Sequence, residues 1–397
     1  MHRNSPIPRI ALLLSVAFFS SPLLAAEANP LLKLAPSQNP LDAGWELRGT
    51  PLFDGGWIEE GKPGQGCLVV RQGWWQTPPL AVEPFHYYRL KFSSKTECQA
   101  YWAVAFLDDK GQELAADVYD GIDASQDWQS ATFCFRAHAL AKRVRIRFQP
   151  NAKALFVKDI LLERVNVADV AAWADGVAAV NPLLRYEAPA NRCERLPETM
   201  KTLQQGGELR IVMLGDSICN DTSNSLYETL LMRAYPKARI EVVTSVRGGT
   251  GCQFYKDPPH VQEYVLRFHP DLVIIAGISH GYDTEAIRSV IRQIKKASSC
   301  EILVLTGAIT PADWCKQEYL KHVPLSQGLE NVEKFTARMR RMTDEEHVEF
   351  LDMRSDWDEY LLYSPRPCEW FHRDIIHGNS RGKQVVGRIL LRYFEPR

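Results

Sequence analysis

The chain has 397 residues, and its 47 lysines and arginines are balanced by 48 aspartates and glutamates, which leaves a net charge of -1. This balance, without a long block of like charge, gives no reason to expect a nucleic acid or an anionic membrane as a partner. The length is more than a single hydrophobic core usually serves, so we expect two folded domains.

The N-terminus has the pattern of a secretory signal peptide. His2, Arg3 and Arg9 precede an apolar run over residues 10–19, and small residues follow at Ala25 and Ala26. The run is too short to span a bilayer, and no cysteine near the cleavage position indicates a lipid anchor. We therefore predict that residues 1–26 are removed and that the protein is secreted or periplasmic, without a membrane anchor.

Residues 36–165 have the pattern of an all-β domain. Alternating or apolar stretches, separated by turn residues such as Asp108-Asp109-Lys110-Gly111, predict strands over 66–71, 87–93, 101–108, 130–136, 144–149 and 154–163. This spacing predicts a sandwich of the jelly-roll kind. The segment resembles the carbohydrate-binding sandwiches that are often attached to polysaccharide-active enzymes. Its aromatic residues either form a sugar-stacking surface or fill the core and the domain interface: Trp57, Trp74, Trp75, Tyr101, Trp102, Tyr119 and Trp128.

Residues 166–207 are predicted to be a connector with helices over 167–180 and 198–205, interrupted by prolines. From residue 208 to 397, apolar strands alternate with amphipathic helices. We expect strands over 209–214, 240–244, 272–276, 302–306 and 348–351, and helices over 223–235, 261–268, 284–297, 329–342 and 380–393. This alternation predicts an α/β domain with a parallel sheet and helices on both faces. Such a sheet collects its site from the loops at the carboxyl ends of the strands.

The strand over 209–214 leads into Gly215-Asp216-Ser217, the first candidate for chemistry. We expect a helix to follow, with its N-cap at Asp221, Thr222, Ser223 or Asn224. A serine at the carboxyl end of a strand, beside a helix N-terminus, suits a nucleophile whose transition state develops an oxyanion. An ordinary strand-to-helix turn is the alternative.

A serine nucleophile needs a base and a group that orients the base. His377 is the candidate base, and Asp374 lies three residues before it, so one loop turn sets the carboxylate against the imidazole. The alternative is a capping aspartate and a surface histidine. Oxyanion donors are expected from the glycine-rich loop Arg247-Gly248-Gly249 after the second strand and from Gly277-Ile278-Ser279-His280 after the third.

The four blocks occur in the order found in SGNH (GDSL-type) hydrolases, which residues 209–397 resemble. The resemblance implies a flavodoxin-like parallel sheet, with Ser217 as nucleophile, His377 as base and Asp374 as its partner. It also implies that Ser217 and Gly248 donate backbone N–H groups to the oxyanion, with Gly249 as the alternative to Gly248.

The third block departs from the family pattern, which is usually Gly-x-Asn-Asp. Ser279 holds the place of the asparagine, and His280 is the alternative donor if the loop is shifted by one residue. Because one lost donor typically costs about 10²–10³ in rate, we expect another group to substitute. Arg247, His280 and Trp370 are further candidates for substrate contacts.

Other motifs are weaker. The chain has nine cysteines, without the spacing of a zinc site, and Cys219 and Cys252 are either bridged beside the site or buried as free thiols. Gly378-Asn379-Ser380-Arg381-Gly382 matches the nucleophile elbow of α/β-hydrolases. That fold needs an acid and a histidine after the serine, and residues 381–397 contain neither aspartate nor histidine, so we interpret this match as accidental.

The sequence therefore predicts a secreted serine esterase that acts on a carbohydrate, most simply on O-acetyl groups, through an acyl-enzyme and without a cofactor or metal. One alternative is a lipid esterase or thioesterase of the same fold. Another is a glycan-binding protein whose hydrolase half is inactive, which the absent asparagine leaves open. The expected partner is an acylated polysaccharide or oligosaccharide. No heptad or apolar repeat indicates an oligomer interface, so the oligomeric state stays open.

Overall fold

A computed structural model describes residues 30–34, 40–49, 52–59, 66–309 and 325–396. The predicted signal peptide, residues 1–26, lies outside the described residues. Within the described ranges, no helix combines the length and the apolar character needed to cross a membrane.

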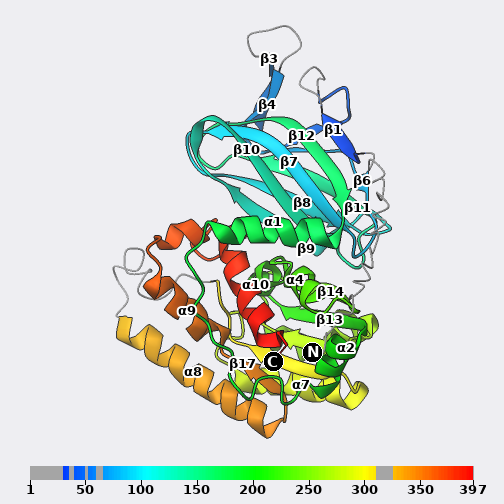
Figure 1. The fold of residues 1–397 in the computed structure, drawn as a ribbon. Coiled ribbons are helices and arrows are strands. Elements are labelled where there is room, and N and C mark those ends of the chain that lie inside the picture. Colours follow the sequence, from blue (N-terminus) through cyan, green and yellow to red (C-terminus); the bar gives the residue numbers. More distant parts are fainter. Residues whose placement is uncertain (1–29, 35–39, 50–51, 60–65, 310–324, 397) are drawn as a thin grey trace, which may run out of the picture.

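The N-terminal part is a β-sandwich, as predicted (Figure 1). In the described residues it has two antiparallel sheets of six strands each. One contains β1 (Leu32–Leu34), β3 (Asp54–Glu59), β4 (Gly66–Gln72), β7 (Tyr87–Thr96), β10 (Ser125–Arg136) and β12 (Leu155–Val165). The other contains β2 (Glu46–Arg48), β5 (Trp74–Gln76), β6 (Leu80–Ala81), β8 (Ala100–Leu107), β9 (Glu113–Ile122) and β11 (Arg143–Gln149). The alternating residues of β7, β8 and β11 face a shared core that includes Phe92, Trp102 and Phe148.

Two features of the sandwich differ from expectation. Strand β1 pairs with β12, so the first sheet includes residues before position 36. Strand β9 was not predicted, because alanines, aspartates and a glycine make its sequence, ELAADVYDGI, a weak strand signal. It pairs along its length with β8 and forms an edge of the second sheet.

The connector contains two predicted helices, α1 (Val167–Ala179) and α2 (Pro197–Gln205). The Asn166 side chain accepts a hydrogen bond from the Asp169 N–H, and the Asp169 carboxylate accepts one from the Asn166 N–H. Together these two bonds form a capping box at the start of α1. Helix α1 runs between the sandwich and the C-terminal part (Figure 1). It is tied to the sandwich by Trp173, whose Nε1 donates to the Thr132 carbonyl at 2.9 Å.

The C-terminal part contains a parallel sheet, as predicted. Among the described residues it has five strands: β13 (Gly207–Gly215), β14 (Ala238–Val246), β15 (Leu272–Ile275), β16 (Glu301–Leu305) and β17 (Glu349–Leu351). Their order is β14-β13-β15-β16-β17, which is the 2-1-3-4-5 order of flavodoxin-like sheets. Alternate residues pack in two different clusters, Ile274 and Leu303 in one and Val273 and Val304 in the other, because helices cover both faces.

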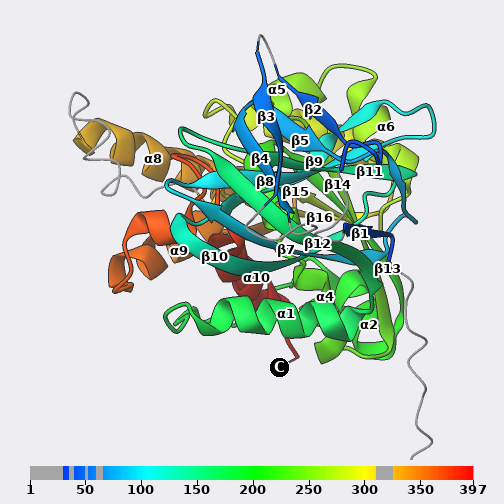
Figure 2. The ribbon, with the colours of Figure 1, turned by 90° about the horizontal axis from the view of Figure 1, so that it is seen from above.

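The helices that cover the sheet and supply its loops are α3 (Ser217–Ser223), α4 (Tyr227–Ala234), α5 (Cys252–Tyr255), α6 (His260–Tyr264), α7 (Thr284–Ala297), α8 (Leu325–Glu345), α9 (Met353–Tyr363) and α10 (Ser380–Phe394). The helix predicted over 223–235 corresponds to α4, which begins only at Tyr227. Ser223 is the last residue of α3, and Leu226 between the two helices has a left-handed backbone with φ of 58°. Seen from above, α8 and α9 extend beyond the sandwich on one side (Figure 2).

The sandwich meets the C-terminal part along the edge strand β9, which lies against α3 and β14. The Asp117 carbonyl accepts hydrogen bonds from the side chains of Asn220 at 3.1 Å and Asn224 at 2.9 Å. The Tyr119 carbonyl accepts one from Lys383 Nζ at 2.8 Å. Side chains of the C-terminal part therefore bind the backbone groups that an edge strand leaves unpaired.

A buried ion pair forms the second contact between the two parts. Arg136 on β10 pairs with Glu228 on α4, and their side chains are only 3% and 0% exposed. Arg136 also donates to the hydroxyls of Ser223 at 3.0 Å and Thr244 at 3.2 Å, while the Tyr87 hydroxyl donates to Glu228 at 3.1 Å. These contacts satisfy charges that would be costly to bury alone.

Candidate active site

Ser217 lies at the first position of helix α3, directly after strand β13. The helix begins earlier than the sequence analysis placed it, and its N-cap is Asp216. The Asp216 carboxylate accepts from the N–H groups of Ile218 at 2.9 Å and Cys219 at 3.3 Å. The expectation of an N-cap among residues 221–224 is wrong, because residues 221–223 lie inside the helix and Asn224 is its C-cap. The Ser217 N–H, at the helix start, has no helical carbonyl to bind.

Asp216 also joins the turn at residues 215–217 to the loop after β15. Its second oxygen accepts from the N–H groups of Ile278 at 2.7 Å and Ser279 at 2.6 Å, and the side chain is buried. This approach requires glycine at position 277, where φ is 116° and a Cβ would lie 2.5 Å from Asp216 Oδ1. The carboxylate thus fixes two loops at the carboxyl edge of the sheet.

The structure brings Ser217, His377 and Asp374 together. The distance from His377 Nε2 to Ser217 Oγ is 2.9 Å. On the other side of the ring, Nδ1 lies 2.9 Å from Asp374 Oδ2 and 3.0 Å from Oδ1. The His377 and Asp374 side chains are 23% and 33% exposed, so the row of groups is reachable from solvent.

The charge of Asp374 sets the proton positions in this row. Burial alone would raise the pKa of its carboxyl, but hydrogen bonds from the His377 ring and from the N–H groups of His377 and Ile376 hold the pKa well below its usual range. An ionised carboxylate only accepts hydrogen bonds, so His377 Nδ1 carries the proton. Nε2 is then the acceptor for the Ser217 hydroxyl.

Arg373 fixes the loop that carries Asp374 and His377. This role of Arg373 was not predicted from the sequence. Its guanidinium donates to Asp221 Oδ1 at 2.7 Å and to the Gly378 carbonyl at 2.8 Å. The side chains of Arg373 and Asp221 are 5% and 1% exposed. The Gly378 N–H donates to the other oxygen of Asp221 at 3.1 Å, so both ends of the loop are bound to helix α3.

The residues expected to bind the oxyanion differ in exposure and in whether their N–H groups are already bound. Gly248 is exposed in the loop after β14, and a Cβ there would meet nothing within 4 Å. The Arg247 N–H just before it donates to the Gly215 carbonyl at 3.0 Å, which fixes this loop beside the turn at residues 215–217. The Ser279 N–H is already used by Asp216, so only its side chain is left as a donor.

Of the other candidates for substrate contacts, His280 is only 2% exposed, so that role does not fit its position. Instead its Nδ1 accepts from the Cys252 N–H at 3.4 Å, and burial lowers its pKa, which favours the neutral ring. Arg247 lies over the Phe254 ring at 4.8 Å. Trp370 lies between the guanidinium groups of Arg366 at 4.3 Å and Arg381 at 4.2 Å.

Cys219 and Cys252 are free, buried thiols, so the bridged alternative is wrong. Of the described cysteines, Cys368 alone is disulfide-bonded. Ser380, the serine of the second motif, is the first residue of α10, and its N–H donates to Asp120 at 3.1 Å. Across the described ranges, no three His, Cys, Asp or Glu side chains gather as metal ligands would.

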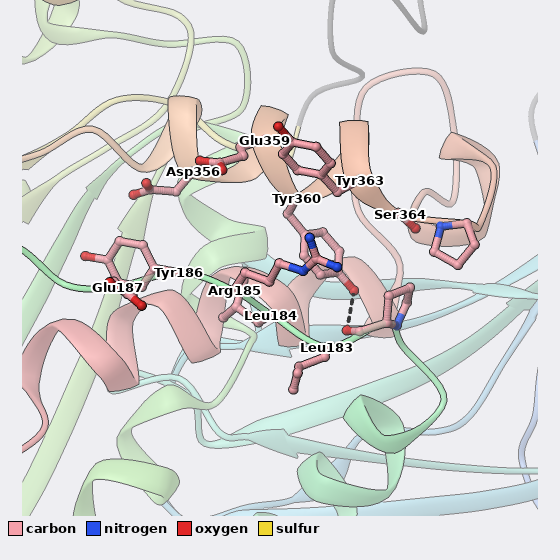
Figure 3. Close-up of a pocket in the computed structure, with 12 residues that line it drawn as sticks. Leu183, Leu184, Arg185, Tyr186, Glu187, Asp356, Glu359, Tyr360, Tyr363 and Ser364 are labelled. Carbon is pink, nitrogen blue, oxygen red and sulfur yellow. Dashed lines mark hydrogen bonds between the residues drawn. The ribbon is translucent and has the colours of Figure 1, made fainter.

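A cavity of about 480 Å³ lies away from this row of groups, between the connector and helix α9 (Figure 3). Tyr360 closes part of it, with its hydroxyl bound to the Pro182 carbonyl at 3.0 Å. Burial and the nearby carboxylates of Asp352 and Glu359 raise the pKa of Asp356 in its wall to about 7. Ser217, Asp374 and His377 do not line this cavity.

Comparison with known proteins gives partial matches only. No protein-family model matches the chain, and no curated protein matches it. Among solved structures, a two-domain esterase (CEX) active on acetylated mannans is 18% identical, with a TM-score of 0.39. That match covers 51% of this chain and 52% of the esterase, so the chain spans about half of its length.

Two further solved structures match separate parts. The acetylxylan esterase Axe2 from Geobacillus stearothermophilus is 19% identical over 48% of this chain and 96% of its own, with a TM-score of 0.38. The CBM22-1 xylan-binding domain of Xyn10C from Paenibacillus barcinonensis is 13% identical over 35% of this chain and 96% of its own, with a TM-score of 0.29. TM-scores below 0.5 do not establish a shared fold, so any function proposed for this chain rests on its own residues.

Proposed function

We propose that the protein is an exported serine esterase of the SGNH type, which hydrolyses O-acetyl esters on a carbohydrate. The observation that supports this proposal most directly is the row of hydrogen-bonding groups from Ser217 through His377 to Asp374, with distances of 2.9 Å on both sides of the imidazole. A hydroxyl, a neutral base and an ionised carboxylate in this order are the parts that acyl transfer requires.

In the first half of the reaction, His377 Nε2 takes the hydroxyl proton as Ser217 Oγ attacks the ester carbonyl. The carbonyl oxygen becomes an oxyanion, which the N–H groups of Ser217 and Gly248 and the side chain of Ser279 stabilise in this proposal. His377 then gives the proton to the departing sugar oxygen, and the acetyl group stays on Ser217. Asp374 stabilises the imidazolium throughout.

In the second half, His377 removes a proton from water, which attacks the acetyl carbonyl on Ser217. The second tetrahedral intermediate collapses, acetate leaves, and the proton returns from His377 to Ser217 Oγ. Every proton in this scheme is carried by His377, so the proposal calls for no cofactor.

The carbohydrate part of the proposal is supported by the position of the β-sandwich. Its edge strand β9 contacts helix α3, which begins at the proposed nucleophile. The sandwich is therefore part of the surroundings of the site. A substrate large enough to contact both parts, such as an oligosaccharide, fits this arrangement.

The proposal is tested by measuring acetate release from acetylated xylan, mannan and pectin, together with hydrolysis of 4-nitrophenyl acetate. The native protein should release acetate from at least one polysaccharide, and Ser217→Ala should lower kcat by about 10⁶-fold, as loss of the nucleophile does in a serine protease. Ser380→Ala is the matched control, since that serine belongs to the motif interpreted as accidental. Equal rates for native protein and Ser217→Ala would exclude Ser217 as the nucleophile.

The same panel separates the alternative substrates. Activity that rises with acyl-chain length on 4-nitrophenyl esters, without acetate release from any polysaccharide, would indicate a lipid esterase or thioesterase. Binding to polysaccharides without hydrolysis of any ester would indicate a glycan-binding protein.

A further inference from the structure

The aromatic residues of the sandwich differ in whether they are available to a ligand. Trp75 and Trp102 are each 1% exposed and belong to the core. Trp128 is covered by the ammonium groups of Lys158 at 4.0 Å and Lys95 at 4.9 Å. Tyr101 on β8 and Tyr119 on β9 are both partly exposed, and of these two it is Tyr119 that has a guanidinium, that of Arg373, over its ring at 5.1 Å.

Tyr101 and Tyr119 pack against each other, so each ring covers part of one face of the other. Their ring centroids are 5.3 Å apart and the ring planes differ by 21°, so the two rings are stacked. Neither phenolic oxygen bonds to another described residue, and neither is buried, so both hydroxyls remain available to a ligand. A partly exposed aromatic face with free hydroxyls combines an apolar contact with hydrogen bonding.

This pair lies beside the proposed catalytic residues. The Arg373 guanidinium lies 5.1 Å from the Tyr119 ring centroid, and its Nε lies 3.7 Å from Asp374 Oδ2. A Cβ on Gly121, which pairs with Tyr101 across the strands, would lie 3.5 Å from the Cβ of Arg373. The pair is therefore connected to Ser217 through Arg373, Asp374 and His377.

The pKa values of Tyr101 and Tyr119 are both raised, in part by neighbouring groups of the site. Burial raises the pKa of Tyr101, and the Asp374 carboxylate raises it further. Burial, and to a smaller extent the neighbouring Tyr101, raises the pKa of Tyr119 to about 12, although Arg373 acts in the opposite direction. Both phenols therefore keep their protons at neutral pH and can donate hydrogen bonds.

We infer that the outer face of the Tyr101 ring, supported from behind by Tyr119, is a stacking platform for a sugar ring next to the acetylated unit, so that the β-sandwich supplies part of the substrate site. A pyranose presents a face of C–H groups to an aromatic ring and hydroxyls at its rim, which matches both properties of the pair. The platform lies on the Asp374 side of the site. This inference rests on the proposed esterase function.

The test compares acetylated xylotriose and mannotriose with 4-nitrophenyl acetate, which has no sugar. In Tyr101→Ala, kcat/KM for the better trisaccharide should fall about tenfold relative to that for 4-nitrophenyl acetate, mainly through KM, because an aromatic contact is lost. Tyr101→Phe should restore most of this ratio, since it keeps the ring. Trp128→Ala, at an aromatic residue covered by lysines, should leave the ratio unchanged.

The outcomes separate the platform from the enzyme. If the native protein releases acetate from a trisaccharide and Tyr101→Ala keeps the native ratio, the platform is overturned and the esterase stands. Equal losses on both substrates would show that Tyr101 supports the fold of the site, and would also overturn the platform. A native protein that releases no acetate from any saccharide would overturn the proposed carbohydrate specificity and the platform with it.

Discussion

Arg373 and Asp374 are neighbours in the chain, yet they belong to two regions with opposite properties. Asp374, with His377, faces the open site and is 33% exposed. Arg373 lies 3.7 Å from Asp374 through its Nε and extends into a buried cluster with Asp221, Lys383 and Asp120. The side chains of this cluster are between 1% and 5% exposed. Both regions consist of hydrogen-bonded charges, and they differ in their access to water.

The difference shows how the loop can be both accessible and fixed. A partly exposed carboxylate on a free loop would lose its geometry easily, since exposed ion pairs contribute little to stability. The buried cluster supplies the missing rigidity, because movement of Arg373 would remove the shortest ion pair of Asp221 in a dry environment and leave Lys383 Nζ at 3.6 Å. The exposed side of the loop performs the proposed chemistry, and the buried side holds it in place.

The largest expected effect comes from the exposed side. Asp374→Asn keeps one acceptor oxygen but no longer enforces the proton on His377 Nδ1, so kcat should fall by about 10⁴-fold, as it does for the equivalent change in a serine protease. Steady-state hydrolysis of 4-nitrophenyl acetate measures this. A kcat within tenfold of native would mean that Asp374 does not orient the base.

The next effect comes from the buried side. Arg373→Met removes one partner of a buried pair, and we expect the free energy of unfolding to fall by about 3–5 kcal/mol. The matched change is Arg164→Met: Arg164 pairs with Glu83 at 2.9 Å, the two side chains are 46% and 62% exposed, and the cost should be about 1 kcal/mol or less.

Urea unfolding at pH 7.5 measures both variants in the same buffer. Similar losses for Arg373→Met and Arg164→Met would contradict the distinction between buried and exposed ion pairs, because that distinction requires burial to decide the cost.

A smaller effect concerns pH at the interface between the two parts. His138 is buried, with its Nε2 3.0 Å from the Thr244 carbonyl, and burial lowers its pKa to about 4. In the unfolded chain a histidine titrates near 6.5, so as the pH falls the unfolded state binds the proton first. The stability that depends on neutral His138 is present above about pH 6.5 and is lost toward pH 4, by about 2–3 kcal/mol.

Urea midpoints at pH 7.5, 6 and 5 measure this loss, and His138→Gln removes the titrating group. The variant should show a flatter dependence of stability on pH than the native protein. Identical slopes would mean that other groups control acid unfolding.

Much of this arrangement follows from local patterns in the sequence. The strands of the parallel sheet are apolar runs, and the spacing of Asp374 and His377 lets one turn of loop join them. The pairing of His377 with Ser217, 160 positions away, was expected from the order of the motif blocks in the family that the sequence resembles. The double role of Asp216 was not predicted, because half of its hydrogen bonds go to residues 278 and 279 on another loop.

The contribution of the sandwich was the hardest to predict. Strand β9 has weak strand formers, and Asp117 and Asp120 read as turn residues until their partners are known. Those partners, Asn220 and Lys383, lie 103 and 263 positions away in the sequence. Tyr119 could therefore be named only as one of seven aromatic residues with two possible roles.

The bound edge of β9 has a consequence for engineering. If the chain were truncated after residue 165, the Asp117 and Tyr119 carbonyls would lose the side-chain amides and the ammonium group that bind them. The exposed edge strand would then promote self-association. We therefore expect that the sandwich cannot be fused to another enzyme as an independent domain. Its transplantation would have to carry Asn220, Asn224 and Lys383 along with it.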